Sequence, residues 1–561
     1  MVLAAESQLR LDANWIDYLL VAFYFAFVLG IGIMARRSVS SSIDFFLSGR
    51  SLPAWVTGLA FISANLGAVE ITGMSANGAD YGYPTFHYFW VGAVPAMLFL
   101  GIVMMPFYYG SKVRSVPEYM NRRFGPTAHL VNAISFAVAQ LLIAGINLYL
   151  LASIVNILLG WPLWVSLIVA AAVVLTYTAL GGLSAAIYNE VLQFFIIVAA
   201  LLPLTLVGLH KVGGWEGFTD KVSNGPGGDQ QLSSWPGTAL AGFDSELLSV
   251  IGIVFGLGFV LSFGYWTTNF VEVQRAMASS SMSAAQRSPI IGAFPKMFIP
   301  FIVIIPGMIA AISVQEIVEF KETGQGSVEY NQSILYLMRD LLPNGMLGLA
   351  IAGLLASFMA GMAANISAFN TVFSYDLWQT YVVKEREDDY YTGVGRVATV
   401  GATVIAIGTA TFAASYSNVM DYLQTLFGFF NAPLFATFIL GMFWKRMTPT
   451  AGWTGLVAGT GAAITVWVLS EDVTGTIGIG GQGGAFVAAG AAFVVDVLVS
   501  VLVTAVTRPK AESELRGLVW SLTPRKDFHD PDEPALSWYQ RPTTLAGIGL
   551  VMVVALNFLF A

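Results

Sequence analysis

Two ionisable residues of opposite charge, Glu70 and Lys296, lie inside long apolar stretches of the sequence. A charged side chain at the centre of a membrane costs roughly 2.5 to 3.5 kcal/mol on insertion scales, so such a residue usually faces a cavity or a partner. A link between Glu70 and Lys296, direct or through a bound molecule, would relieve both costs. The alternative is that Glu70 is a buried carboxyl bonded to a neighbouring hydroxyl, such as that of Thr72 or Ser75.

Other polar and aromatic residues in these stretches could complete a binding pocket. Tyr265 and Trp266 are adjacent, and aromatic rings can stack on the flat apolar face of a sugar or block an exit path. Asn65 and Gln424 are neutral hydrogen-bonding groups, and each alone is more often a contact between helices than a ligand contact. Glu190 lies at the expected start of a span, where water can reach it. These residues form a site only if the fold brings them together.

The composition excludes several kinds of chemistry. The chain has no cysteine, which rules out disulfides, thiolate metal sites and cysteine nucleophiles. Its four histidines have no helical H-x-x-x-H spacing, so zinc catalysis is not expected. No nucleophile and base constellation indicates an enzyme, and we expect no cofactor and no nucleic-acid partner.

The elements that must position these residues are membrane-spanning helices. Of the 561 residues, 56% are hydrophobic and 11% are charged, and the mean hydropathy is +0.71. Crossing a hydrocarbon core of about 30 Å takes roughly 20 apolar residues in a helix, whereas an open strand leaves backbone groups unpaired. The sequence therefore predicts an all-α polytopic membrane protein in a lipid bilayer. We count fourteen spans, beginning near residues 15, 53, 85, 127, 161, 187, 246, 288, 346, 395, 421, 450, 483 and 542.

Two of these spans contain helix-weakening sequence in their middle. The second contains Asn65 and Gly67 shortly before Glu70, and the seventh contains three glycines before Tyr265. Interrupted helices at corresponding positions of two repeats place free backbone carbonyls and helix dipoles around a mid-membrane site. The alternative is that glycine simply lets membrane helices pack closely. The three glycines of the seventh span, to which both readings apply, are Gly256, Gly258 and Gly264.

Lysine and arginine are sorted between alternate loops. Most of the 26 basic residues fall in one set of loops, which includes Arg122, Arg275 and Lys445. Loops rich in basic residues face the cytoplasm. We therefore expect a multi-pass protein of the cell (plasma) membrane with both termini outside. Residues 212–245 are expected to be an external loop, and residues 508–541 a cytoplasmic linker.

Seven segments of the chain form a specific pattern between about residues 46 and 446. In order, they are SGRSLPAW, ANLGAVEITGMS, GGLSAAIYNEVLQ, YWTTNFVEVQRAMA, PKMFIPFIVIIPG, ASFMAGMAANISAFNTVFSYDLW and YLQTLFGFFNAPLFATFILGMFWKR. Together they resemble the sodium/solute symporter family, in its branch of sodium-glucose and sodium-galactose cotransporters. The resemblance implies a LeuT-like fold of two inverted five-helix repeats with flanking helices.

The fold implied by this resemblance divides the chain into five parts. A first flanking helix and its cytoplasmic loop would occupy residues 1–52. The two five-helix repeats would occupy residues 53–211 and 246–446, separated by the external loop 212–245. Residues 447–561 would hold the C-terminal flanking helices and the cytoplasmic linker.

The resemblance also implies a solute site. The sugar site of the family maps onto Asn65, Glu70, Tyr265, Lys296 and Gln424, with Ser262 and Trp266 beside them. Three positions depart from the family pattern. Glu70 replaces a glutamine or histidine, Phe89 stands where a sugar-binding glutamate is expected, and Ser262 stands where an asparagine is expected. These departures argue against galactose itself, while a polyhydroxylated solute still fits.

The implied cation site departs further from the family. Sodium would be held by the backbone carbonyls of Ser63, Leu66 and Ser357 together with two serine hydroxyls. Those serines are replaced here by Ala360 and Gly361, neither of which has a hydroxyl. Because sodium is a hard cation that prefers several oxygen ligands, three carbonyls alone would be a poor cage.

Two alternatives for the coupling ion therefore remain, sodium and the proton. Sodium could bind through carbonyls and water, with Glu190 in place of the aspartate of a second sodium site, or Glu70 could carry a proton. The expected function is cation-coupled symport of a small polar solute, and a sugar is the first candidate. The alternative is an uncoupled uniporter or a solute sensor of the same fold. Nothing in the sequence predicts an oligomeric state.

Overall fold

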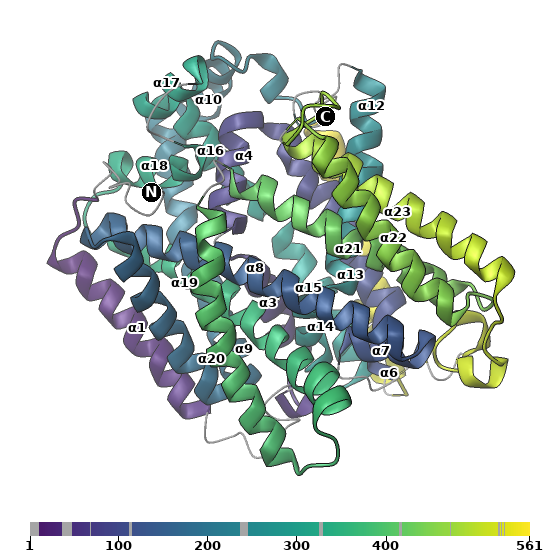
Figure 1. The fold of residues 1–561 in the computed structure, drawn as a ribbon. Coiled ribbons are helices and arrows are strands. Elements are labelled where there is room, and N and C mark those ends of the chain that lie inside the picture. Colours follow the sequence, from purple (N-terminus) through teal and green to yellow (C-terminus); the bar gives the residue numbers. More distant parts are fainter. Residues whose placement is uncertain are drawn as a thin grey trace.

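The computed structural model describes residues 11–35, 48–67, 69–110, 115–235, 240, 245–324, 329–414, 418–471, 473–524, 528, 530–531 and 533–561. Every regular element within these ranges is a helix (Figure 1), which confirms the all-α prediction. The one β-type pairing in the same ranges is an isolated bridge between Leu52 and Ser279.

The helices follow one another along the chain with few long connections. The longer ones are α1 (Trp15–Ala35), α3 (Ala54–Asn65), α8 (Pro126–Leu159), α9 (Leu163–Val212), α15 (Met282–Lys296), α16 (Ile299–Ser313), α19 (Met346–Thr371), α20 (Asp388–Ala413), α21 (Val419–Phe443), α22 (Pro449–Leu469), α23 (Gly481–Val506) and α24 (Pro542–Leu559). The shorter ones are α4 (Met74–Tyr81), α5 (Val94–Phe99), α6 (Met105–Gly110), α7 (Val116–Phe124), α10 (Gly214–Ser223), α12 (Glu246–Ile251), α13 (Phe263–Thr268), α14 (Phe270–Met277), α17 (Gln315–Thr323) and α18 (Ser333–Leu341). The π-helical segments are η4 (Val69–Gly73), η6 (Tyr88–Ala93), η7 (Leu100–Met104), η9 (Gly252–Ser262) and η11 (Val372–Val382).

Eleven helices in the described part of the chain are long and apolar enough to cross a membrane, and one bent pair of helices makes up to twelve. Two shorter apolar helices, Trp15–Ile31 and Leu163–Thr176, lie where two further spans were expected. The stretches predicted near residues 161 and 187 are joined in α9 without an intervening loop. The count of fourteen spans therefore stays a prediction.

Large apolar side chains cover the outside of the helical bundle. Helix α1 lies on one flank of the bundle, and α22 and α23 lie side by side on the other (Figure 1). Phe23 on α1, Val397 on α20 and Leu502 on α23 are 67%, 73% and 67% exposed. A soluble protein rarely exposes this much apolar surface, whereas lipid tails cover it without cost.

The second expected span is broken where the sequence predicts. Helix α3 ends at Asn65 and the chain becomes helical again at Val69, with a bend of 58° between the two parts. The Gly67 N–H donates to the Asn65 carbonyl at 2.7 Å instead of to the carbonyl four residues earlier. A Cβ on Gly67 would lie 3.2 Å from the Gly361 Cα and 3.0 Å from the Asn147 Oδ1, so glycine permits this close approach to α8 and α19.

The seventh expected span does not break at its glycines, and this correction has a physical reason. Leu247–Thr268 is one helix whose middle is the π-helical η9. A Cβ on Gly256 would lie 3.0 Å from the Phe486 carbonyl oxygen, so this glycine serves close packing against α23. The interruption lies instead at Asn269, which has an extended backbone. Its Oδ1 accepts from the Val271 N–H at 3.0 Å and so caps the start of α14.

The two interrupted segments meet in the interior of the bundle. Helix α3 packs against α14 and α15, and α19 packs against α3 and α8. Helix α13 lies against α21 and η9. The end of α3, the end of α15 and the junction of α13 with α14 are thereby brought to one place, where the site is found.

Candidate functional site

Glu70 and Lys296 form a direct ion pair at this place. The Lys296 Nζ donates to the Glu70 Oε1 at 2.6 Å, and the Lys296 and Glu70 side chains are 2% and 11% exposed. Glu70 is in η4, just after the break, and Lys296 is the last residue of α15. The sequence predicts a link between these residues, either direct or through a bound molecule. The structure shows a direct one, which relieves the cost of burying each charge alone.

A chain of hydrogen bonds extends from this pair to the second interrupted helix. The Lys296 Nζ also donates to the Asn65 Oδ1, and the Asn65 Nδ2 donates to the Tyr265 hydroxyl at 3.1 Å. The ammonium lies over two rings, 4.8 Å from the centroid of Phe89 and 5.2 Å from that of Trp266. One cation is therefore held by a carboxylate, an amide oxygen and two aromatic faces.

These residues line a cavity of about 90 Å³ between the broken helices. Every residue predicted to bind solute lines it, and these are Asn65, Glu70, Ser262, Tyr265, Trp266, Lys296 and Gln424. Asn147, Asn269 and Asn365 line it as well, although sequence reasoning did not select them. The cavity is smaller than the roughly 300 to 1,000 Å³ of typical ligand pockets. A solute larger than a few waters would therefore require the surrounding helices to separate.

Two residues predicted to hold a cation, Leu66 and Ser357, meet beside the first break. The Ser357 hydroxyl on α19 donates to the Leu66 carbonyl at 2.5 Å. Ser63 is fully buried, and its hydroxyl has no hydrogen-bond partner among the described residues. Ala360 and Gly361 follow one turn along α19 and offer no side-chain oxygen. The structure thus brings Ser357 to the Leu66 carbonyl, while positions 360 and 361 supply no side-chain oxygen.

Glu190 is placed differently from the expectation that water reaches it. It is 1% exposed, and both of its oxygens accept from Arg275: Oε1 from Nη2 at 2.6 Å and Oε2 from Nε at 3.3 Å. Arg275, which the sequence pattern places in a cytoplasmic loop, is also fully buried. The two charges neutralise each other inside the protein, so Glu190 would have to release Arg275 before it could bind a cation.

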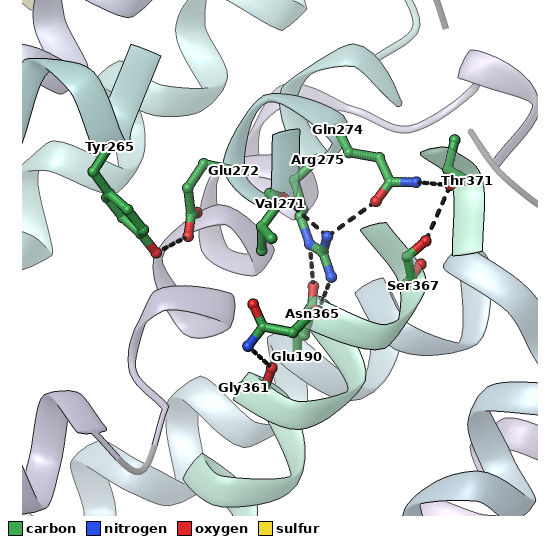
Figure 2. Close-up of polar contacts among 10 residues, drawn as sticks. All are labelled: Glu190, Tyr265, Val271, Glu272, Gln274, Arg275, Gly361, Asn365, Ser367 and Thr371. Atoms are coloured by element: carbon green, nitrogen blue, oxygen red, sulfur yellow. Dashed lines mark hydrogen bonds and ion pairs between the residues drawn. The ribbon is translucent and has the colours of Figure 1, made fainter. Parts of the chain in front are cut away.

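Sequence reasoning missed Glu272, which lies in the first turn of α14 and is fully buried. Its Oε1 accepts a hydrogen bond from the Tyr265 hydroxyl at 2.6 Å, and the two side chains point toward each other (Figure 2). Its neighbour Arg275 turns toward Glu190 (Figure 2). The available signal was a carboxylate between two valines, Val271 and Val273.

A known protein family matches most of this chain. The family model described as Sodium:solute symporter family matches residues 45–459, which is more than half of the chain. The chain belongs to the sodium:solute symporter family. Its membership makes it a membrane transporter of small solutes rather than an enzyme.

Several relatives of this symporter-family chain are named as sodium/glucose cotransporters. The sodium/glucose cotransporter of Vibrio parahaemolyticus is 28% identical over 469 residues, which cover 81% of this chain and 85% of that protein. Sodium/glucose cotransporter 1 of Ovis aries is 27% identical over 567 residues, which cover 94% of this chain and 83% of that protein.

A solved structure shares the fold of this symporter-family chain. The substrate-bound, outward-open state of a Na⁺-coupled sialic acid symporter superposes with a TM-score of 0.73 at 18% identity, and the match covers 89% of this chain and 99% of that one. At this identity the likeness establishes the architecture and leaves the solute to the pocket residues.

Proposed function

We propose that this protein is a cation-coupled symporter of a small polar solute, with a sugar as the first candidate. The observation that carries the proposal is the Glu70 and Lys296 ion pair, which faces a cavity beside Tyr265 and Trp266. Burying charged groups in a membrane protein costs free energy. Binding of a polar solute to the Glu70 and Lys296 pair would explain why the chain has them.

The pocket has the donors and acceptors that a polyhydroxylated solute needs. Glu70 can accept from a hydroxyl, Lys296 can donate to one, and the Gln424 amide can do both. The faces of Tyr265 and Trp266 offer apolar surface for the C–H face of a sugar ring. The relatives named above support the same solute class. Phe89 in place of an acidic residue makes galactose a weaker candidate than other sugars.

Transport would follow alternating access around this fixed site. The bend at Asn65 to Val69 and the interruption at Asn269 let two half-helices move separately from the helices that continue. In this proposal the fourteen spans form two inverted five-helix repeats with flanking helices, in a plasma membrane with both termini outside.

Cysteine labelling tests the orientation, because the chain has no cysteine of its own. Asp12, before α1, and Ser513, in the expected cytoplasmic linker, are both exposed. Impermeant reagent should label Asp12→Cys from outside intact cells and should leave Ser513→Cys unlabelled until the cells are opened. The reverse pattern would place both termini in the cytoplasm.

Sodium is the first candidate for the coupling cation. The place for it is beside the first break, where the backbone carbonyls of Ser63, Leu66 and Ser357 would bind it with water completing the shell. The family membership and the sodium-coupled relatives support this choice. Ala360 and Gly361 argue for weak binding, since sodium favours a fuller set of oxygen ligands.

A second candidate function follows from Ala360 and Gly361, which lack the side-chain oxygens of a cation site. Without a working ion site, the pocket would serve an uncoupled uniporter or a solute sensor. Accumulation of D-glucose in proteoliposomes separates the two functions. A symporter concentrates the sugar above its external level when a sodium or proton gradient is imposed. A uniporter only equalises the two levels, and a sensor binds without moving the sugar.

A further inference from the structure

Glu272 is a buried carboxylate that the ion pairs described above do not use. Its side chain is 0% exposed. Its Oε1 accepts from the Tyr265 hydroxyl, whereas its Oε2 has no hydrogen-bond partner among the described residues (Figure 2). Buried polar atoms are nearly always paired, so an unpaired carboxylate oxygen at this depth calls for an explanation.

Each cation near Glu272 already has a carboxylate of its own. Lys296 pairs with Glu70 at 2.6 Å, and Arg275 pairs with Glu190 at 2.6 Å. Lys296, Arg275 and Glu190 are the charged groups whose fields reach Glu272. Helices α3 and α19 also pack on α14 but contain no ionisable side chain. Two cations therefore face three carboxylates.

Among the described residues, the other neighbours of α14 add one positive charge, that of Arg287 on α15, which interacts with Asp530 rather than with Glu272. Helix α6 contributes the tyrosines Tyr108 and Tyr109, whose hydroxyls donate to backbone carbonyls. On α15, Arg287 donates to the backbone carbonyl of Ser283. The positive end of the α14 dipole favours an ionised Glu272, but by less than the burial of an unpaired charge costs. A proton on Glu272 removes that cost.

Tyr265 connects Glu272 to the solute cavity. Its hydroxyl donates to Glu272 and accepts from Asn65, which in turn accepts from Lys296. Asn269 and Val271, on the same turn as Glu272, line the cavity. When Glu272 is ionised, the Tyr265 hydroxyl is held as its donor. When Glu272 carries a proton, it can donate in return, and the tyrosine proton becomes free to point at a solute oxygen.

We propose that Glu272 is a proton-binding site whose occupancy is linked to the solute cavity through the Tyr265 hydroxyl. The link to transport rests on the function proposed above, whereas the proton site does not. Glu70, the carrier that the sequence suggested, has Lys296 to hold it ionised. Glu272 has no such partner. We therefore assign the proton site to Glu272 instead of Glu70.

Infrared difference spectroscopy on the full chain in lipid nanodiscs tests the site without any solute. A protonated carboxylic acid has a C=O stretch that no ionised carboxylate gives. We expect this band to fall as the pH is raised, and its Glu272 component to be absent from Glu272→Gln. The glutamine variant keeps the shape of the protonated acid and an oxygen for the Tyr265 hydroxyl. The exposed Glu216 serves as a matched control, and Glu216→Gln should keep the full band.

A second variant tests the link to Tyr265 and covers the case that Glu272→Gln does not fold. Tyr265→Phe keeps the ring but removes the hydroxyl that donates to Glu272. We expect the frequency of the Glu272 band to shift in this variant. An unchanged band in Glu272→Gln would overturn the proton site, and an unchanged frequency in Tyr265→Phe would overturn the link. A chain that fails to move D-glucose would contradict glucose as the solute of the proposed function and leave both infrared results interpretable.

Discussion

The Lys296 Nζ lies 2.6 Å from the Glu70 Oε1, although the two residues are 226 positions apart and belong to different helices. The pair joins the end of α15 to the segment that follows the first helix break. Because both side chains are buried, each charge depends on the other for its place in the protein. A change to either residue therefore affects both.

Removing one member of the pair should destabilise the protein. Lys296→Met leaves the Glu70 charge buried and alone, and breaking such a pair costs about 3 to 5 kcal/mol. The double variant Glu70→Gln, Lys296→Met removes both charges and should recover most of the loss. Thermal unfolding in detergent measures this. Equal unfolding temperatures for the wild type and Lys296→Met would show that the pair carries no stability.

Tyr265→Phe should weaken both solute binding and the fold. The change leaves the Asn65 amide and the Glu272 carboxylate without their shared hydroxyl, and each buried group left unpaired costs about 1 to 3 kcal/mol. We expect at least a tenfold weaker affinity in a D-glucose titration followed by the intrinsic tryptophan fluorescence, to which Trp266 contributes. Tyr18→Phe, in a half-exposed residue of α1, is the control and should bind as the wild type does. Equal affinity of Tyr265→Phe and the wild type would remove the tyrosine from the site.

Ala360→Ser should strengthen sodium binding, because it adds a hydroxyl one turn along α19 from Ser357, whose own hydroxyl contacts the Leu66 carbonyl. The neighbouring position cannot be used in the same way. A Cβ on Gly361 would lie 2.6 Å from the Asn147 Oδ1 and 3.0 Å from the Gly67 Cα, so Gly361→Ala should unfold at a lower temperature. The measurement is the rise in unfolding temperature with sodium concentration. If Ala360→Ser needs as much sodium as the wild type, the cation does not bind there.

Lys321, on α17 outside the spans, should make stability depend on pH. Burial lowers the pKa of Lys321 from its ordinary 10.5 to about 8, and the charge of Asp80 opposes part of that shift. Between pH 8 and 10.5 the unfolded chain therefore binds a proton that the folded chain does not, so stability rises with pH across this window. Below pH 8 both forms are protonated, and the dependence on pH vanishes.

Comparing the wild type with Lys321→Met isolates this contribution, since the other titrating groups are shared. The unfolding temperature of the wild type should gain on that of the variant as the pH rises from 8 toward 10.5. A constant difference between the two proteins over this range would contradict the prediction.

The sequence predicts well those features that follow from the free-energy cost of burying polar or charged groups in an apolar helix. A carboxylate and an ammonium in apolar stretches must find partners, which is why the pairing of Glu70 with Lys296 could be expected. The break after Asn65 is equally local, because a polar residue and Gly67 interrupt an apolar helix within three positions. In both cases the signal itself is local, although the partner of Glu70 lies 226 positions away.

The features that the sequence does not reveal depend on partners far away in the chain. Gly256 resembles a helix breaker until Phe486 is seen packed against it. Glu190 looks accessible until Arg275, 85 positions away, is found bonded to both of its oxygens. Arg275 was counted as a loop residue because charge alone does not tell a cytoplasmic loop from a buried ion pair.

The central claim is that solute is exchanged at the Glu70 and Lys296 pair, and counterflow tests it without assuming a coupling ion. Proteoliposomes preloaded with unlabelled D-glucose should take up labelled D-glucose above its equilibrium level for a time. We expect Lys296→Met to abolish this overshoot, and Lys211→Met, in an exposed lysine at the end of α9, to retain it. An overshoot of wild-type size in folded Lys296→Met would contradict the account.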